Sequence, residues 1–282
     1  MIRVTDAYLE SLITEDVPYI DLTTEILGIG DALGEIEYFT REDAVLCGTE
    51  EVIRMMRMLD IEVTYSVPSG TRIAAGDVFL KAQGRADQLH MAWKACLNVF
   101  DHYSAISTKT RQMVDLAHSV NPAVQILTTR KSTPGTKPLT TKAVMVGGAF
   151  PHRLGLSETV LVFDQHLQFM GGIDGLISHM AEIRSRCVEK KLFVEANKED
   201  AIRLVQAGVD GIQLDKVPAE ELTDLIWTLK SINPHITLIA AGGINMTNVK
   251  DYASTGVNGI ATTALYTCKP LDMSVRMHAL QQ

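Results

Sequence analysis

Five cationic side chains are concentrated in a loop-forming stretch between residues 128 and 166. They are Arg130, Lys131, Lys137, Lys142 and Arg153, with His152 beside the last. No Asp or Glu occurs from Leu116 to Ser157, although the chain has 34 acidic residues and a net charge of −8. Uncompensated positive charge in an acidic protein predicts a site for a small, multiply anionic ligand. A solvated basic face is the alternative, but such faces usually mix acidic residues with basic ones.

Two carboxylates follow neighbouring apolar segments and are the candidates for catalysis and metal binding. Glu195 follows the segment LFV, and Asp215 follows GIQL. Mg2+ in proteins is typically held by one or two carboxylates together with phosphate oxygens of a substrate. A carboxylate can also stabilise a developing positive charge. The sequence therefore predicts Glu195 and Asp215 as ligands of a Mg2+ ion, although either one alone could be the structural partner of a nearby lysine.

A glycine pair provides a candidate phosphate site. Ala241, Gly242 and Gly243 precede a helix that we expect to begin at Asn245. Backbone N–H groups at such a turn can bind phosphate, and the late loops of an α/β barrel are a frequent phosphate site. A tight turn without a ligand explains the glycine pair equally well, so only its place in the chain favours phosphate binding.

Several other kinds of chemistry lack the residues they need. The histidines form no HxH or HExxH motif, and Asp164 with His166, expected on one strand face, is a poor metal signal. The absence of a GxxxxGK[ST] loop argues against nucleotide hydrolysis. The acidic charge balance argues against nucleic acid as a partner, and no segment has the apolar length that predicts a membrane span. The four cysteines form no CxxC pair and predict reduced core residues of a cytoplasmic protein.

The candidate residues require a scaffold that brings strand ends together. After Pro122, short apolar segments alternate with helical sequence, at 124–127, 160–163, 192–194, 211–214, 236–240 and 259–261. Strands this short and apolar are buried on both faces, which is typical of a parallel sheet covered by helices. The lack of a GxGxxG turn favours an α/β barrel over a doubly wound sheet. Polar groups follow each segment, as expected for a site at the C-terminal ends of barrel strands.

The N-terminal third has a mixed α and β character. Residues 33–39 alternate like a strand, 49–59 have helical spacing, and 61–83 is typical of short strands joined by turns. A long amphipathic helix is predicted from about Asp87. Lys94 and Asn98 lie four residues apart on this helix and away from its apolar stripe, so we expect them to face something other than the local core.

Several motifs in combination resemble the quinolinate (nicotinate-nucleotide) phosphoribosyltransferase family. They are TRKSTPGTK at 129–137, KAVMVGGAFPHRLGL at 142–156 and DQH at 164–166. The similarity continues through EDVPYIDLTT near the start, CLNVFDHYSAISTKT at 96–110, VEANKEDAIRLVQAGVDGIQLDKV at 194–217 and AAGGI at 240–244. It covers nearly the whole chain. GGAFPHRLGLSE and VFDQH are most similar to a pyrophosphorylase branch found with molybdate-transport genes.

The resemblance implies an α/β fold made of an N-terminal α/β sandwich and an incomplete α/β barrel. Residues 1–110, completed by 266–282, would form the sandwich, and 111–265 would form the barrel with the active site. The implied reaction is Mg2+-dependent transfer of phosphoribose from phosphoribosyl pyrophosphate (PRPP) to an aromatic ring nitrogen, with release of pyrophosphate. The implied assembly is a homodimer or a higher homo-oligomer.

The resemblance also assigns roles to individual residues. Lys131, Glu195 and Asp215 would be catalytic, the last two as Mg2+ ligands. Substrate binding would fall to residues that match the family's TRK and HR motifs and to two further lysines: Thr129, Arg130, Lys131, His152, Arg153, Lys94 and Lys142. Phosphate binding would fall to Ala241, Gly242, Gly243, Thr263 and Ala264, with Ala241 where the family has Ser and Thr263 where it has Gly.

Two departures from the family pattern concern the acceptor. Trp93-Lys94 stands where the family usually has Glu-Arg, at a helix position that reaches a neighbouring subunit's site. Phe163 stands where the family has a lysine of its pyridine-dicarboxylate site. Lys and Arg are not equivalent in carboxylate recognition, and a second carboxylate buried without a cation is costly. We therefore expect the acceptor to be a monocarboxylate or an uncharged aromatic nitrogen compound.

Two functions from other classes remain open at this point. A Schiff-base barrel lyase would use a strand-end lysine such as Lys131 with a depressed pKa. A non-catalytic, molybdate-linked oxyanion-binding protein would use the same basic stretch without needing Glu195 and Asp215.

Overall fold

The computed structural model describes residues 2–281 and divides into two compact units. The first unit extends to Arg111 and also contains Thr133–Gly148 and the chain from Tyr266 onwards. The second unit consists of Gln112–Ser132 and Ala149–Leu265. We expected Thr133–Gly148 within the barrel domain. Its contacts instead assign it to the same unit as the N-terminal part of the chain. All helices of the described residues fall short of the length or the apolar character that a membrane-spanning helix needs.

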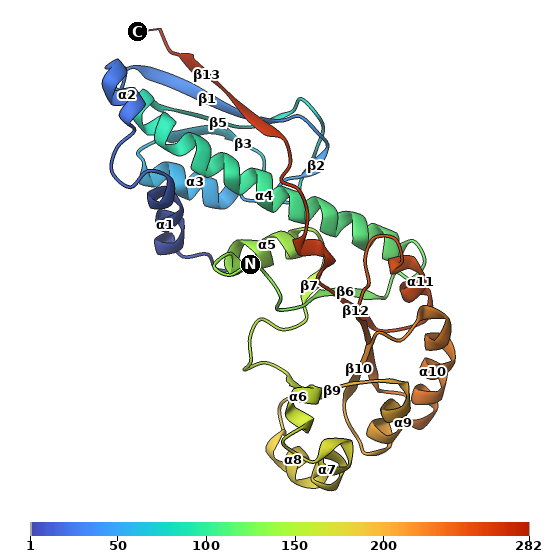
Figure 1. The fold of residues 1–282 in the computed structure, drawn as a ribbon. Helices are drawn as coiled ribbons and strands as arrows, with labels where there is room; N and C mark the ends of the chain where they lie inside the picture. Colours follow the sequence, from blue (N-terminus) through green and yellow to red (C-terminus); the bar gives the residue numbers. More distant parts are fainter. Residues whose placement is uncertain (1, 282) are drawn as a thin grey trace. The chain divides into compact units, whose positions relative to one another are not determined.

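The first unit is built on a four-stranded antiparallel sheet. Its order is β13 (Met273–Ala279), β1 (Leu33–Thr40), β5 (Val78–Arg85) and β3 (Glu62–Ser66), so the C-terminal strand pairs with the first one. Helices α3 (Thr49–Met58) and α4 (Ala86–His118) lie along one side of this sheet (Figure 1). Tyr38 and Phe79 of the sheet pack against Phe100 of α4, with 4.8 Å between the Phe79 and Phe100 ring centroids. Alternate residues of β1 are buried because a strand points them to one face.

Smaller elements complete the first unit. They are helices α1 (Asp6–Asp16), α2 (Leu22–Leu27) and α5 (Lys137–Val146) and the two-stranded pair β2 (Ala44–Val45) and β4 (Arg72–Ile73). Helix α2 begins after Asp21, whose carboxylate accepts from the N–H groups of Thr23 and Thr24 and so satisfies the free donors of the first turn. Cys47 and Cys96 are buried here, whereas Cys187 and Cys268 are only partly buried. Two of the four cysteines are thus core residues, fewer than expected.

The second unit is built on a curled, seven-stranded parallel sheet, which confirms the incomplete α/β barrel. Its strand order is β7 (Phe150–Pro151), β6 (Gln125–Thr128), β12 (Gly259–Thr262), β11 (Thr237–Ala241), β10 (Gly211–Asp215), β9 (Leu192–Ala196) and β8 (Val160–Val162). The six predicted apolar segments coincide with six of these strands, and the two-residue β7 was not predicted. Strands β7 and β8 stand at opposite ends of the order, so the barrel is left open between them.

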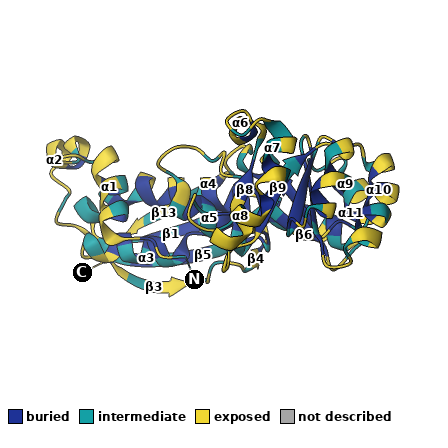
Figure 2. Cartoon of the chain, turned by 90° about the horizontal axis from the view of Figure 1, so that it is seen from below, coloured by how far each residue is buried: buried dark blue, intermediate teal, exposed yellow. Residues whose placement is uncertain are grey.

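Helices surround this sheet on its outer side. Figure 1 shows α9 (Lys198–Gln206), α10 (Ala219–Ile232) and α11 (Val249–Ser254) there, and in Figure 2 the strands are dark blue while the outer helix faces are yellow. Asn197 caps α9 by accepting from the N–H of Asp200 at 2.9 Å, and Pro218 immediately precedes α10. Short helices α6 (Asp164–Leu167), α7 (Gly172–Ser178) and α8 (Met180–Arg186) follow β8, and a 3-10 turn at Ala264–Tyr266 follows β12.

The inner face of the parallel sheet carries an apolar cluster. It consists of Leu161, Phe193, Ile239, Ala241 and Ala261, with the partly buried Leu127 and Phe163 packed against it. Gly211 makes room for this packing, because a Cβ atom there would lie 2.2 Å from a carbon of the Phe193 ring. Successive inward residues of a strand are two apart. The next inward positions after Phe193 and Ala261 are therefore Glu195 and Thr263, at the end of the sheet where the site is found.

Candidate active site

A cavity of about 630 Å3 opens at the C-terminal ends of the parallel strands, within the second unit. Most of the predicted site residues line it: Thr129, Arg130, Lys131, His152, Arg153, Glu195, Asp215, Ala241, Gly242, Gly243 and Thr263. The basic stretch, the carboxylates and the glycine pair therefore meet in one place, because parallel strands deliver their carboxyl ends to the same edge.

The two carboxylates lie on neighbouring strands, as expected. Glu195 of β9 is in register with Gln213 of β10, and the Gln213 amide donates a hydrogen bond to the Glu195 carboxylate. Asp215 is two residues beyond Gln213 and lines the same cavity. Burial raises the pKa of Glu195, and the charge of Asp215 raises it further, while Lys131 and Lys216 act in the opposite direction. A cation bound between the two carboxylates would relieve the repulsion between their charges.

The most buried cation of the cavity is Arg153, with 9% of its surface exposed. Its guanidinium lies over the ring of Phe163, 5.5 Å from the centroid. Across residues 2–281, no side chain is hydrogen-bonded or ion-paired to it. Burial lowers the pKa of Arg153, and the nearby charge of Arg130 lowers it further. The charge of Glu158 opposes this lowering, but no carboxylate pairs directly with the guanidinium in the described chain. A largely buried guanidinium without a direct ion-pair partner can bind a carboxylate or phosphate strongly.

His152 contributes a neutral group beside this arginine. Burial lowers the pKa of His152, and the charge of Arg153 lowers it further. Its ring meets Phe193 edge-on, with 6.4 Å between centroids. Because the ordinary pKa of histidine is already below 7, His152 is a neutral hydrogen-bonding group at neutral pH and adds no charge to the site.

The glycine turn brings the ends of β10 and β11 close together. Gly242 and Gly243 have φ angles of 89° and 75°, which other residues rarely adopt. A Cβ atom on Gly242 would lie 2.8 Å from the Asp215 carboxylate. The expected helix at Asn245 is wrong, since α11 begins at Val249. Side-chain amides of Asn245 and Asn248 instead donate to the carbonyl of Gly243, at 3.2 and 3.3 Å, and form a turn.

Sequence reasoning missed three polar residues that line the cavity, namely Gln165, Gln213 and Lys216. The position of Gln213 could have been found, because it precedes Asp215 by two residues and so shares its face. Lys216 follows directly after Asp215, where alternation would turn it away. It lines the cavity because its backbone leaves the strand with a φ of 56°.

The expectation that Asp164 and His166 share a strand face is wrong. Strand β8 ends at Val162, and α6 begins at Asp164. His166 Nδ1 accepts from the N–H of Phe163 at 2.9 Å, and the Asp164 carboxylate accepts from the Gln168 amide. Both side chains are therefore hydrogen-bonded within their own segment. Phe163 and Gln165 are the residues of this segment that line the cavity.

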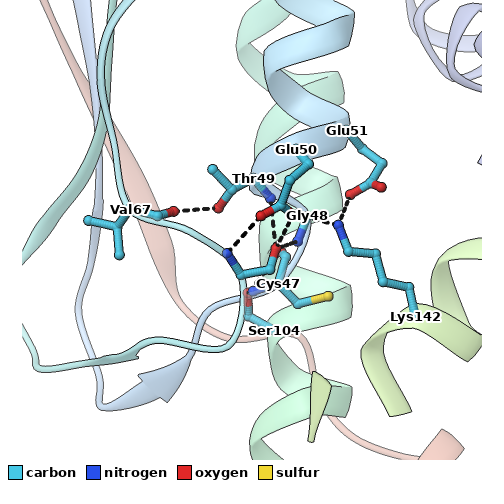
Figure 3. Close-up of polar contacts among 9 residues, drawn as sticks. Cys47, Gly48, Thr49, Glu50, Glu51, Val67, Ser104 and Lys142 are labelled. Carbon is cyan, nitrogen blue, oxygen red and sulfur yellow. Dashed lines mark hydrogen bonds and ion pairs between the residues drawn. The ribbon is translucent and has the colours of Figure 1, made fainter. Parts of the chain in front are cut away.

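Two predicted substrate-binding lysines belong to the first unit. Lys142 of α5 donates to the carboxylate of Glu50 at 2.5 Å and also to that of Glu51 (Figure 3). Glu50 in turn accepts from the hydroxyl and the N–H of Ser69. Burial opposes ionisation of Glu50, but the bonds from Lys142 and Ser69 outweigh it and lower its pKa to about 2. Lys94 is exposed on α4, with its ammonium 4.9 Å from the centroid of the Trp93 ring.

The remaining predicted residue, Ala264, opens the 3-10 turn after β12, and its N–H donates to the Thr262 hydroxyl at 2.9 Å. It does not line the cavity, whereas its neighbour Thr263 does. Within the described part of the chain, no three His, Cys, Asp or Glu side chains cluster in a way that could hold a metal ion. A metal at this site would therefore rest on the Glu195–Asp215 pair and on ligands brought by a substrate.

Comparison with known proteins identifies the class to which this fold and site belong. Residues 21–104 match the family model "Quinolinate phosphoribosyl transferase, N-terminal domain", and residues 106–276 match the corresponding C-terminal domain. The chain therefore belongs to the quinolinate phosphoribosyl transferase family, whose members are pentosyltransferase enzymes.

Individual relatives match over nearly their whole length. A ModD protein of Escherichia coli O157:H7, provisionally named a pyrophosphorylase, is 34% identical over 278 residues, 98% of each chain. A Methanothermobacter thermautotrophicus protein, provisionally named a carboxylating nicotinate-nucleotide pyrophosphorylase, is 30% identical over 277 residues, 97% of this chain and 99% of that one. The crystal structure of a NadC deletion mutant has a TM-score of 0.90 and 26% identity, and the match covers 99% of this chain and 100% of that one.

Proposed function

We propose that the protein is a Mg2+-dependent phosphoribosyltransferase that joins PRPP to an aromatic ring nitrogen and releases pyrophosphate. One observation carries the proposal. A single cavity places the carboxylate pair Glu195 and Asp215 together with the cations Arg130, Lys131 and Arg153. Transfer of a phosphoribosyl group needs both kinds of group, because positive charge develops on the sugar while negative charge develops on the leaving pyrophosphate.

The protein's own residues account for both halves of the reaction. The bond between the sugar C1 and the pyrophosphate oxygen breaks, and a bond between C1 and the ring nitrogen forms. Glu195 and Asp215 would stabilise the oxocarbenium-like sugar between these events. Arg130 and Lys131 would hold the pyrophosphate through charge-assisted hydrogen bonds. Holding donor and acceptor side by side would supply much of the rate acceleration.

The carboxylate pair fits a Mg2+ ion that arrives with the donor. Burial raises the pKa of Glu195, and repulsion from the charge of Asp215 raises it further. A divalent cation would relieve that repulsion. Mg2+ commonly binds one or two carboxylates and completes its shell with phosphate oxygens and water. Glu195 and Asp215 would hold it, and the ion would supply charge stabilisation for the departing pyrophosphate.

Arg153 and Phe163 indicate the class of acceptor. The guanidinium of Arg153 offers one buried partner for a carboxylate, and the Phe163 ring beside it offers an aromatic face. Leu161 and Ala261 extend that apolar surface. A second carboxylate placed against it would be buried without a cation, at a cost of several kcal/mol. The acceptor is therefore proposed to be an aromatic nitrogen compound with one carboxylate or none.

We propose further that the protein forms a homodimer or a higher homo-oligomer. Segment 19–29 of the first unit exposes large apolar side chains, including Tyr19 at 91% and Ile26 at 75%, and Figure 2 shows α2 in yellow. Exposed apolar surface of this kind marks an interaction site. The proposed role of Lys94 in a neighbouring subunit's site depends on this assembly. Ile26→Asp should convert the oligomer to monomer in analytical ultracentrifugation, and a parent protein that sediments as a monomer would remove the proposal.

The activity is tested by measuring pyrophosphate release from PRPP across a panel of pyridine and other aromatic nitrogen acids, with and without Mg2+. We expect release that needs both an acceptor and Mg2+. Equal release without Mg2+ would remove the metal from the proposal. Oxyanion binding that survives in Glu195→Gln/Asp215→Asn, without turnover in the parent, would favour an oxyanion-binding protein. Covalent trapping of a substrate on Lys131 by borohydride would favour a Schiff-base lyase.

A further inference from the structure

Lys216 has a backbone conformation that its residue type disfavours. Its φ of 56° lies in the left-handed region, and Asp60 is the only other non-glycine residue with positive φ in the described chain. Lysine lacks the short polar side chain that eases this conformation for Asn and Asp. The N–H of Lys216 donates to the carbonyl of Ala241 at 2.8 Å, which ties the end of β10 to the end of β11 and holds the conformation. Strain retained at a cavity edge suggests a role for the side chain that it positions.

The Lys216 side chain lies across the glycine turn. A Cβ atom on Gly242 would be 2.6 Å from Lys216 Cγ, so the glycine leaves the space that the lysine stem occupies. The side chain is 81% exposed, and its ammonium is 3.7 Å from the Asp215 carboxylate, which is a loose ion pair. Lys216 lines the cavity together with Gly242 and Gly243. The lysine stem therefore lies against the glycine turn, while its ammonium lies near the Asp215 carboxylate.

The strand order separates Lys216 from the other cations of the cavity. Arg130 and Lys131 follow β6, and Arg153 follows β7, at one end of the sheet. Lys216 follows β10, and strands β12 and β11 intervene. A donor such as PRPP carries a pyrophosphate and a phosphomonoester on opposite sides of its ribose. Two separate cationic positions match two separate anionic groups.

We propose that Lys216 binds the phosphomonoester of the donor against the Gly242–Gly243 turn and pairs with Asp215 while the donor is absent. This inference rests on the proposed function, since it assigns the second anionic group of the same substrate. Binding of the donor would draw the ammonium from Asp215 to the phosphate. Asp215 is thereby released for its role beside the reacting sugar. The opposing interpretation is that Lys216 serves only to neutralise Asp215.

The test compares Lys216→Asn, which tolerates the left-handed backbone, with Lys216→Arg, which keeps the charge. The probes are ribose 5-phosphate and inorganic pyrophosphate, titrated by calorimetry into the full-length protein.

We expect Lys216→Asn to weaken ribose 5-phosphate binding by about tenfold or more, because a charge-assisted bond is lost. Pyrophosphate binding should change by less than about twofold, because the proposal gives Lys216 no charge-assisted contact with pyrophosphate. Lys216→Arg should recover most of the loss. Lys250→Asn, an exposed lysine change on α11, is the matched control.

Turnover of PRPP by the parent protein distinguishes a failure of the inference about Lys216 from a failure of the proposed function. If the parent releases pyrophosphate from PRPP but Lys216→Asn binds ribose 5-phosphate normally, the inference about Lys216 fails and the proposed function stands. Weakened pyrophosphate binding with unchanged ribose 5-phosphate binding would place Lys216 at the leaving group and would also overturn it. If the parent neither turns over PRPP nor binds ribose 5-phosphate, the proposed function fails and this inference fails with it. A rise in the KM for PRPP with little change in kcat would support it.

Discussion

Replacement of Lys142 by alanine should destabilise the first unit without abolishing substrate binding. The sequence groups this lysine with the basic stretch, but its ammonium donates to Glu50 and Glu51. The Lys142 side chain is 12% exposed and that of Glu51 is 6% exposed, whereas Glu50 is 44% exposed. After the substitution, Glu50 can turn to water, but Glu51 stays buried without its ion-pair partner.

The size of the effect follows from that buried carboxylate. Breaking a buried ion pair from one side costs about 3–5 kcal/mol, because the remaining charge is left uncompensated. In a chain of this size, such a change lowers the melting temperature by about 10 °C. The pKa of Glu50 is lowered to about 2 against an ordinary value of 4.5. Its contribution to stability is therefore present above pH 4.5 and is lost as the pH falls toward 2. Lys142→Ala should flatten this acid dependence.

Thermal denaturation followed by circular dichroism, with PRPP titrations by calorimetry, measures both consequences. Lys269→Ala, an exposed lysine of the same unit, is the control and should change the free energy of unfolding by less than about 0.5 kcal/mol. Lys142→Met combined with Glu51→Gln removes both buried charges and should recover much of the lost stability. A Lys142→Ala protein that melts like the parent but no longer binds donor or acceptor would refute this reasoning and restore the role predicted from the sequence.

Four further predictions concern the barrel site. Arg130→Ala and Lys131→Ala should each weaken binding of PRPP or of the acceptor acid by about tenfold, with little change in melting temperature. Normal binding by both variants would mean that the basic stretch is misinterpreted. Asp215→Asn should reduce turnover and blunt the Mg2+ dependence, with the free energy of unfolding within about 1 kcal/mol of the parent. Phe163→Lys should raise the steady-state rate with quinolinate relative to nicotinate, and efficient quinolinate use by the parent would contradict the assigned acceptor class. The pKa of His152 is lowered by burial and by Arg153, so the unfolded chain takes up its proton first and stability should fall as the pH drops below 6.5. His152→Phe should lose that slope in denaturant titrations at several pH values, and an unchanged slope would show that another group is responsible.

The parallel sheet could be predicted because its strands are buried on both faces. Each is a short apolar segment, and the polar residue that follows it lies at the shared carboxyl edge, as Glu195 and Asp215 do. Strand β7 could not be predicted, since Phe150–Pro151 is too short to show any period. Segment 245–248 resembles the start of a helix, but the side chains of Asn245 and Asn248 bond to nearby backbone groups and hold a turn instead.

Two features of the site depend on contacts that a linear reading does not contain. Lys142 lies in a segment without acids, and its carboxylate partners come from α3, more than ninety residues earlier in the chain. Lys216 directly follows Asp215, so strand alternation points it away from the cavity. Its positive φ, fixed by a bond to Ala241 of the next strand, turns it back. The placement of Lys142 thus depends on ion pairs with residues distant in the sequence, and the placement of Lys216 depends on a hydrogen bond to the neighbouring strand.

The most direct test of the proposed activity is to identify the product formed from PRPP and a monocarboxylate acceptor such as nicotinate. We predict a nucleotide with the ribose carbon bonded to the ring nitrogen, formed with one equivalent of pyrophosphate, as measured by mass spectrometry and phosphorus NMR. The double variant Glu195→Gln/Asp215→Asn should form none. Failure of the parent protein to form a nucleotide with any aromatic nitrogen acceptor, in the presence of Mg2+ and saturating PRPP, would contradict the assignment of this cavity as a phosphoribosyl-transfer site.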